Sequence, residues 1–165
     1  MKSRNERLSG HVLGHSFSSM LSEHADLEHL FDNHQRALLS KDVGAALATI
    51  TTFENALKRH IRYEDEVLLP LYASKGAEVE GGTLPIFHAE HRKLCEMCAI
   101  LSRHTNALYV SPDMAGSILK LFDEEALFKG LFSHHALREQ NLLFPGLDAC
   151  TTEAEREKAL AEHIV

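Results

Sequence analysis

The amino-acid sequence predicts an all-α protein, an up-down-up-down antiparallel four-helix bundle with a short C-terminal accessory helix. Three observations favour this fold. Four long segments place apolar residues at steps of three and four, which is the spacing of one helix face. No segment shows the alternation of apolar and polar residues that is typical of a half-buried strand. Short loops separate the four segments, and short loops between long helices make those helices antiparallel neighbours.

Size and composition indicate one folded domain. The chain has 165 residues, of which 44% are hydrophobic and 25% are charged. A chain of this length buries about two thirds of its unfolded surface around one core. We expect residues 1–12 to form an N-terminal extension, residues 13–150 to form the bundle and residues 151–165 to form the short C-terminal helix.

The first two helices are expected over residues 13–39 and 43–73, on either side of a turn signal at residues 40–42. Each helix has a stripe of apolar residues that is interrupted by a histidine, His24 in the first and His60 in the second. The two stripes therefore predict a core that contains imidazole rings.

The third and fourth helices are expected over residues 84–108 and 113–147. A loop rich in glycine precedes the third helix. Before the fourth helix, Ser111 is the predicted N-cap and Pro112 suits the first helical turn. The stripes of both helices again contain a histidine, His91 in the third helix and His135 in the fourth.

Proline and capping signals complete the outline. Pro70 and Pro145 are expected to mark bends or ends of the second and fourth helices. A final short helix is expected after Thr152, because Glu155 completes a capping box with it.

Charge and cysteine content exclude several classes of protein. The net charge is −7, and the Lys and Arg residues are dispersed, so neither nucleic acid nor an anionic membrane is an expected partner. No apolar run has the length of a secretory signal or of a membrane span, so we expect a cytoplasmic location. The three cysteines, Cys95, Cys98 and Cys150, do not indicate a disulfide framework, and the pair Cys95 and Cys98 is interpreted as small core residues rather than as a redox motif.

Histidine is the unusual residue, with 12 in the chain. His60 and Glu64 are four residues apart, as are His135 and Glu139, so each pair projects from one helix face, one turn apart. In both segments that face is the apolar stripe. An unpaired charge buried there would cost several kcal/mol, so something must neutralise the two glutamates.

The chain repeats one pattern twice. Glu-His-x-x-Leu occurs at residues 23–27 and 90–94, and His-x-x-x-Glu followed by Pro occurs at residues 60–70 and 135–145. In an antiparallel hairpin, two residues lie level when they are equally far from the turn. The midpoints between successive histidines of the repeats fall at residues 42, 75.5 and 113, each in a predicted turn. We therefore expect His24, His60, His91 and His135 to lie in one layer.

Four imidazoles and two carboxylates in one layer of a bundle core predict a dinuclear metal site. We expect Glu64 and Glu139 to bridge two metals, with His24 and His60 on one metal and His91 and His135 on the other. A solvent-derived bridge would give each metal five donors, which leaves room for a small ligand. Nitrogen and oxygen donors without thiolate favour iron or manganese over structural zinc.

These motifs, in this order, resemble the hemerythrin-like (HHE cation-binding) family over about residues 20–147. The resemblance implies an up-down four-helix bundle with a non-haem di-iron centre, oxo- or hydroxo-bridged, that binds dioxygen, nitric oxide or a related small species. Manganese or zinc are possible substitutes for iron. It assigns the family's ligand positions to six residues of this chain: His24, His60, Glu64, His91, His135 and Glu139.

One departure from the family concerns His88. Oxygen-carrying hemerythrins have a fifth histidine four residues from its partner on the third helix, and an aspartate five residues after the last histidine. Here the last site has Glu139, and the candidate fifth ligand is His88, three residues before His91. Two interpretations of His88 stay open, a metal ligand or a histidine at the rim of the site.

Three classes of function follow. The first is a protein that binds a small diatomic ligand for sensing, storage, iron homeostasis or stress response. The second is an enzyme, a di-iron oxidase or a peroxidase-like protein, although the Glu-x-x-His motif of ferritin-like enzymes does not occur. The third is a metal-free helical interaction module, which leaves two buried glutamates without counter-ions. We favour binding over catalysis, and the oligomeric state stays open.

Two polar residues on the stripes are expected to lie outside the metal layer. His34 is ten residues from His24, which is about 15 Å along a helix axis. We interpret it as a core or rim residue. Glu125 lies near the stripe of the fourth helix, where two interpretations stand, a carboxylate that supports the metal ligands or a solvated carboxylate at the rim of the bundle, and we favour the rim.

Overall fold

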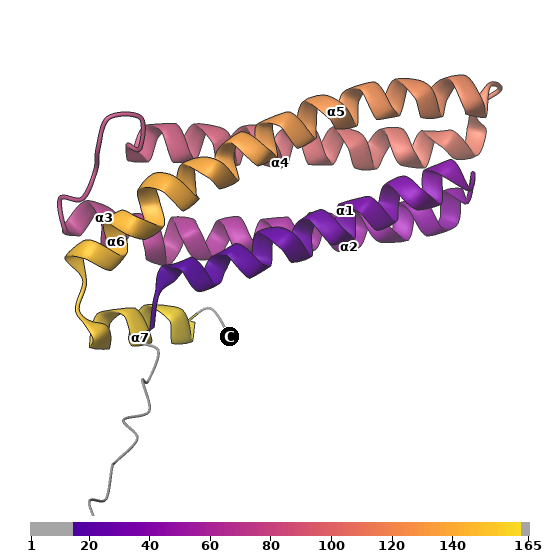
Figure 1. Cartoon of the computed structure of the whole chain (residues 1–165). Coiled ribbons are helices and arrows are strands. Elements are labelled where there is room, and N and C mark those ends of the chain that lie inside the picture. Colours follow the sequence, from indigo (N-terminus) through magenta and orange to yellow (C-terminus); the bar gives the residue numbers. More distant parts are fainter. Residues whose placement is uncertain (1–14, 163–165) are drawn as a thin grey trace, which may run out of the picture.

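A computed structural model describes residues 15–162 and shows the predicted four-helix bundle (Figure 1). The four long helices are α1 (Leu21–Leu39), α2 (Val43–Tyr63), α4 (Leu84–Ala107) and α5 (Met114–Arg138). The hairpin of α1 and α2 packs against the hairpin of α4 and α5, and successive helices run in opposite directions. The all-α, up-down-up-down prediction is therefore confirmed. Among the described residues, no helix is long and apolar enough to cross a membrane.

Two π-helical turns interrupt the second and fourth predicted helices. The turn η2 (Glu64–Leu68) joins α2 to α3 (Leu69–Ser74), and the turn η4 (Glu139–Leu143) joins α5 to α6 (Phe144–Cys150). Each turn is closed by a hydrogen bond that spans five residues, from the Leu69 N–H to the Glu64 carbonyl and from the Phe144 N–H to the Glu139 carbonyl. The helical path continues through both turns.

The prolines explain where these turns lie. Pro70 and Pro145 each follow a π turn by two residues and stand in the first turn of the next helix. Proline has no N–H, and its ring clashes with the carbonyl four residues earlier in a regular α-helix. A widened π turn absorbs that mismatch. The prolines thus mark the restart of a helix.

The ends of two helices differ from the sequence prediction. Residues 13 and 14, the predicted start of the first helix, lie outside the described residues. His15 and Ser16 are not helical, and a 3-10 turn, η1 (Phe17–Met20), precedes α1. At α5, the prediction that Ser111 is the N-cap is wrong. Asp113 is the N-cap and accepts a hydrogen bond from the Gly116 N–H at 3.0 Å, because an Asx side chain there reaches the first free donors of the helix.

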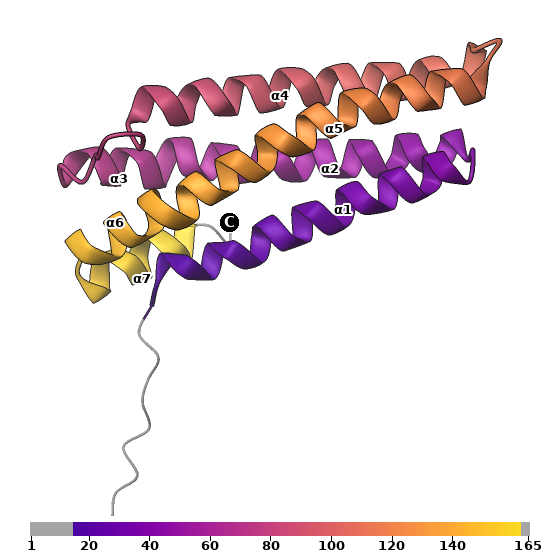
Figure 2. The ribbon, with the colours of Figure 1, turned by 45° about the horizontal axis from the view of Figure 1, so that its top comes forward.

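The accessory helix α7 (Glu153–Glu162) has the predicted capping box. The Thr152 N–H donates to Glu155 Oε2 at 2.8 Å, and the Glu155 N–H donates to Thr152 Oγ1 at 3.3 Å. The Tyr63 hydroxyl donates to the Ala159 carbonyl at 3.0 Å and ties α7 to the end of α2. Figures 1 and 2 place α7 at the same end of the bundle as α3 and α6.

A polar layer divides the core. One apolar cluster fills the longer part of the bundle and contains Leu27, Leu57, Leu94 and Phe132. A second cluster lies under α3, α6 and α7 and contains Met20, Leu68, Phe87 and Leu143. On α1 and α4, the buried residue between the two clusters is a histidine of the repeated motifs, His24 and His91.

Candidate metal centre

Six side chains from all four helices form the polar layer. His24 comes from the first turns of α1, His60 from the end of α2, His91 from the first turns of α4 and His135 from the end of α5. Each π turn begins at a glutamate of the layer. All six are buried, and the largest exposed fraction is 6%, at His24. The structure thus brings together six of the seven residues that the sequence singled out.

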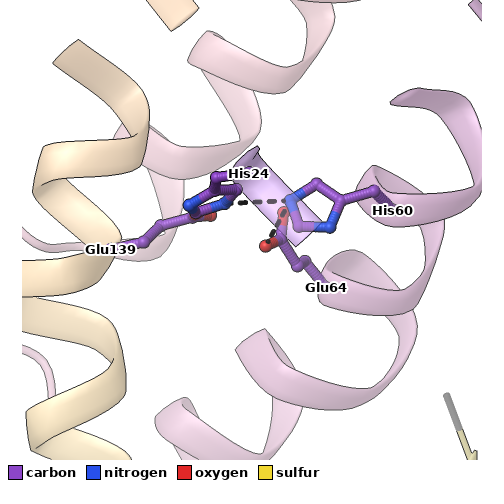
Figure 3. Close-up of side chains that lie close together, drawn as sticks. All are labelled: His24, His60, Glu64 and Glu139. Carbon is purple, nitrogen blue, oxygen red and sulfur yellow. Dashed lines mark hydrogen bonds and ion pairs between the residues drawn. The ribbon is translucent and has the colours of Figure 1, made fainter. Parts of the chain in front are cut away.

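The first half of the layer contains His24, His60, Glu64 and Glu139 (Figure 3). His24 Nε2 lies 2.9 Å from Glu139 Oε2, and His60 Nε2 lies 3.1 Å from Glu64 Oε1. The two Nε2 atoms face one another at 3.2 Å. Two nitrogens and two carboxylate oxygens therefore converge on one point.

The second half contains His91 and His135 with the same two glutamates. His91 Nε2 lies 3.3 Å from Glu64 Oε2, and His135 Nε2 lies 3.0 Å from Glu139 Oε1. Each glutamate therefore offers one oxygen to each half. This is the arrangement expected of two carboxylates that bridge two ions.

Most of these atoms have no hydrogen-bond partner outside the layer. Within the described chain, both oxygens of Glu64, both oxygens of Glu139 and the Nε2 atoms of His91 and His135 are buried, and their polar neighbours are atoms of the layer itself, at 2.9–3.3 Å. Leaving a buried polar atom unpaired costs roughly 1–3 kcal/mol, and more when the group is charged. Six such atoms facing one another point to a ligand that they share.

The spacing suits metal ions. In each half, one ligand atom from each of the four residues lies within 4.8 Å of the others. Two donors on opposite sides of one ion, each about 2.1 Å away, are about 4.2 Å apart. Each half therefore has the composition and spacing to hold one metal ion.

Three carboxylates outside the layer hold the histidine rings. His60 Nδ1 donates to Glu23 at 3.0 Å, His135 Nδ1 donates to Glu90 at 3.0 Å, and His91 Nδ1 donates to Asp65 at 2.8 Å. With Nδ1 protonated, the Nε2 lone pair of a neutral imidazole points into the layer. The sequence alone indicated no role for these carboxylates, although the repeated Glu-His motif contains two of them.

His88 lies outside the two halves of the layer. Its Nδ1 donates to Asp65 Oδ1 at 3.0 Å, and its side chain is 40% exposed. Together with Asp65 and His91 it forms a separate group of three possible ligands. Because His91 Nδ1 contacts the same Asp65 oxygen, His88 lies behind the carboxylate that orients His91.

The buried charges shift the pKa values of the layer. Burial alone would lower the pKa of His60, but the charge of Glu64 and the hydrogen bond with Glu23 raise it to about 10. Burial likewise opposes charge on His91 and His135. The hydrogen bond with Asp65 raises the pKa of His91 to about 11, and the charge of Glu139 raises that of His135 to about 9. Burial opposes ionisation of Glu139, but the charge of His135 holds its pKa well below its usual value.

Buried polar residues also lie apart from this layer, among them Glu125 and His34. The expectation that Glu125 is a solvated rim carboxylate is wrong, because Glu125 is fully buried. His34 Nε2 lies 2.9 Å from Glu125 Oε1, and the Gln35 side chain donates to Glu125 Oε2 at 2.8 Å. The pairing with two side chains of α1 allows a carboxylate inside the core. Cys98 is buried as expected, and burial raises the pKa of its thiol to about 12.

The chain was compared with protein families, with curated proteins and with solved structures. No protein-family model matched the chain, and searches of curated proteins and of solved structures returned no match.

Proposed function

We propose that this chain is a hemerythrin-like protein whose polar layer holds two iron ions and binds a small ligand such as dioxygen or nitric oxide. The observation that carries the proposal is the set of six buried atoms of Glu64, Glu139, His91 and His135 that face one another and have no hydrogen-bond partner outside the layer. Metal ions would satisfy all six atoms, and the two carboxylates would offset their charge.

The chain's own residues determine how the ions would be held. His24 and His60 would hold one ion, His91 and His135 the other, and Glu64 and Glu139 would span both. The hydrogen bonds to Glu23, Glu90 and Asp65 fix three of the four rings with Nε2 facing inward. When bound, the metal pair would supply an open coordination position and the electrons for binding a small ligand.

The donor set supports iron. It consists of imidazole nitrogens and carboxylate oxygens, and none of the described cysteines belongs to either half of the layer. Structural zinc prefers four closed tetrahedral ligands, often thiolates, whereas shared carboxylates and imidazoles suit a pair of iron or manganese ions. Zinc and manganese are then substitutes to be tested against iron.

Metal analysis of aerobically purified protein tests the proposal. We expect about two irons per chain, as inferred from the two four-residue groups, and the absorption of an oxo-bridged di-iron centre. A His91→Ala variant should lose iron, and a His104→Ala variant, which changes an exposed histidine of the same helix, should keep it. Protein that is folded and free of iron after reconstitution would refute the proposal and favour the metal-free interaction module.

A second measurement separates binding from catalysis. The di-ferrous protein is mixed with oxygen or nitric oxide, and the optical spectrum is followed. A persistent spectrum that reverses when the gas is removed supports binding. Repeated consumption of oxygen or peroxide supports the di-iron oxidase or peroxidase-like alternative.

A further inference from the structure

A cavity of about 180 Å³ lies at the seam between α1 and α5. Half of its lining is aromatic, Phe31 from α1, Phe53 from α2, and Phe128 and Phe132 from α5, and half is polar, Glu28, Asp32, Lys129 and Ser133. The four phenylalanines are buried, with exposed fractions of 4% or less. An apolar cavity of about 150 Å³ in a protein core stays dry and takes up benzene or xenon. The seam cavity has a comparable size, and its aromatic side offers a small apolar molecule a surface to pack against.

The aromatic wall leads to the metal layer. The Phe128 and Phe132 rings are stacked, with centroids 6.2 Å apart. Phe132 in turn meets the His24 ring edge-on, with centroids 6.1 Å apart. One phenylalanine ring thus separates the cavity from a histidine of the layer.

The mouth of the cavity is polar. Asp32 and Ser133 line it, and Lys129 Nζ reaches Asp32 Oδ1 at 3.5 Å and Gln35 Oε1 at 3.3 Å across the seam. An ion that passed this mouth would lose its hydration among phenylalanine rings, which costs several kcal/mol. An uncharged diatomic molecule is weakly hydrated, so its transfer into the cavity would cost almost no hydration free energy.

We propose that the seam cavity is the holding site and access route of a small uncharged diatomic ligand, with Phe132 as the gate to the metal layer. This inference rests on the proposed function, because it assigns a route to the same ligand. The gas would enter past Ser133, rest against the packed phenylalanine rings and reach the layer when the Phe132 ring turns aside.

A second cavity, of about 160 Å³, also reaches the metal layer and serves as the comparison for the seam cavity. It lies between α1 and α2 beside His60, and its lining includes Glu23, Asp26 and Arg59. It meets His60 on the side of the ring where Nδ1 is bound to Glu23. The α1–α2 cavity therefore suits a charged or hydrated ligand. It reaches the His60 ring at Nδ1, the nitrogen that faces away from the metal layer.

The first test uses xenon and does not need iron. Zinc-loaded or metal-free protein is titrated with xenon, and binding is followed by xenon NMR and by the shifts of the phenylalanine resonances. We expect saturable binding at Phe128 and Phe132, and a Ser133→Phe variant should abolish it by filling the mouth. A protein that does not bind xenon at this seam overturns the proposal.

The second test measures how fast gas reaches di-ferrous protein in a stopped-flow experiment. Ser133→Phe should slow binding of oxygen and nitric oxide by about tenfold, and Phe132→Ala should accelerate it. Ala56→Phe fills the α1–α2 cavity instead and is the matched control, and its rates should equal those of the unmodified chain. Phe122→Trp controls for a changed aromatic residue of α5 outside the cavity.

The outcomes separate the two proposals. Unchanged rates in Ser133→Phe and Phe132→Ala, or slowing in Ala56→Phe alone, overturn the access route while an intact di-iron spectrum leaves the proposed function standing. A chain that binds no iron overturns both, and the metal analysis identifies that case.

Discussion

Glu90 Oε2 lies 3.0 Å from His135 Nδ1, on the side of the imidazole ring that faces away from Glu139. The same glutamate accepts hydrogen bonds from the Arg138 guanidinium. Glu90 immediately precedes His91, so α4 supplies both a candidate ligand and the carboxylate that orients a ligand on α5. Glu23 and His24 on α1 stand in the same relation to His60 on α2.

Replacing these orienting carboxylates should weaken metal binding without unfolding the bundle. Glu23→Gln and Glu90→Gln keep the size of the side chain but remove the charge that fixes the ring. We expect metal affinity to fall by about 10–100-fold, measured by competition with a chelator. Glu96→Gln, at an exposed position of the same helix as Glu90 and outside both halves of the layer, is the control and should bind normally. Equal affinity in all three variants would contradict the orienting role.

His88 should be dispensable for holding the ions. Because His88 contacts Asp65 and lies outside both halves of the layer, we expect His88→Ala to keep the full metal content. His91→Ala, one helical turn away, should lose it. The metal-to-protein ratio by elemental analysis distinguishes the variants. Loss of one ion in His88→Ala would establish it as a ligand.

The metal-free protein should lose stability at alkaline pH. The folded-state pKa values of His60 and His135 are raised to about 10 and about 9, above the 6.5 of an unfolded histidine. Their stabilising contribution is therefore complete below about pH 6.5 and is lost as the pH rises through 9 and 10. Urea unfolding should show a lower midpoint at pH 9 than at pH 6.5, and His60→Leu should flatten that dependence.

Metal binding should release protons at neutral pH. His60, His91 and His135 are protonated at pH 7 in the metal-free protein because their pKa values are raised to about 10, about 11 and about 9. Metal ligands must be deprotonated, so loading should release up to about three protons and affinity should rise with pH. Calorimetric titration in buffers of different ionisation enthalpy counts the protons. A count of zero would contradict these charge states.

The buried pair of His34 and Glu125 should behave as a unit in stability measurements. Glu125→Leu leaves His34 Nε2 without its partner in the core, while Nδ1 still faces the Ala46 carbonyl, and we expect a loss of about 1–3 kcal/mol in urea unfolding. The double replacement with His34→Leu should cost much less, because it removes both buried polar groups. Glu124→Leu, at a neighbouring position whose side chain is 40% exposed, should change stability by about 0.5 kcal/mol or less.

The sequence is sufficient to predict the helices and the layer, because both depend on periodicity. The midpoints between successive histidines predict that His24, His60, His91 and His135 lie level, and the four rings do lie in one layer. The π turns could not be predicted, because one extra residue in a helical turn leaves the stripe of apolar residues continuous in the sequence. Pro70 and Pro145, each six residues after a glutamate of the layer, are the available signal.

Contacts between helices are harder to predict. Glu23 and Glu90 project beside their own helix stripe, and which neighbouring ring they reach depends on how the helices cross. A carboxylate alone favours water, so the sequence predicts a place at the rim for Glu125. Its burial depends on His34 and Gln35, ninety or more residues earlier in the chain, and no local pattern contains that information.

The two halves of the repeat are held unequally. Asp65 follows Glu64 and binds His91, whereas Gln140, an exposed neutral amide, follows Glu139 at the equivalent position. The His91–His135 half is flanked by Asp65 and by Glu90, whose charge Arg138 offsets, and the His24–His60 half is flanked by Glu23. Carboxylates thus fix both rings of the His91–His135 half and one ring of the other half. In a half-loaded protein, the first cation should therefore bind to the His91–His135 half, whose rings are already oriented.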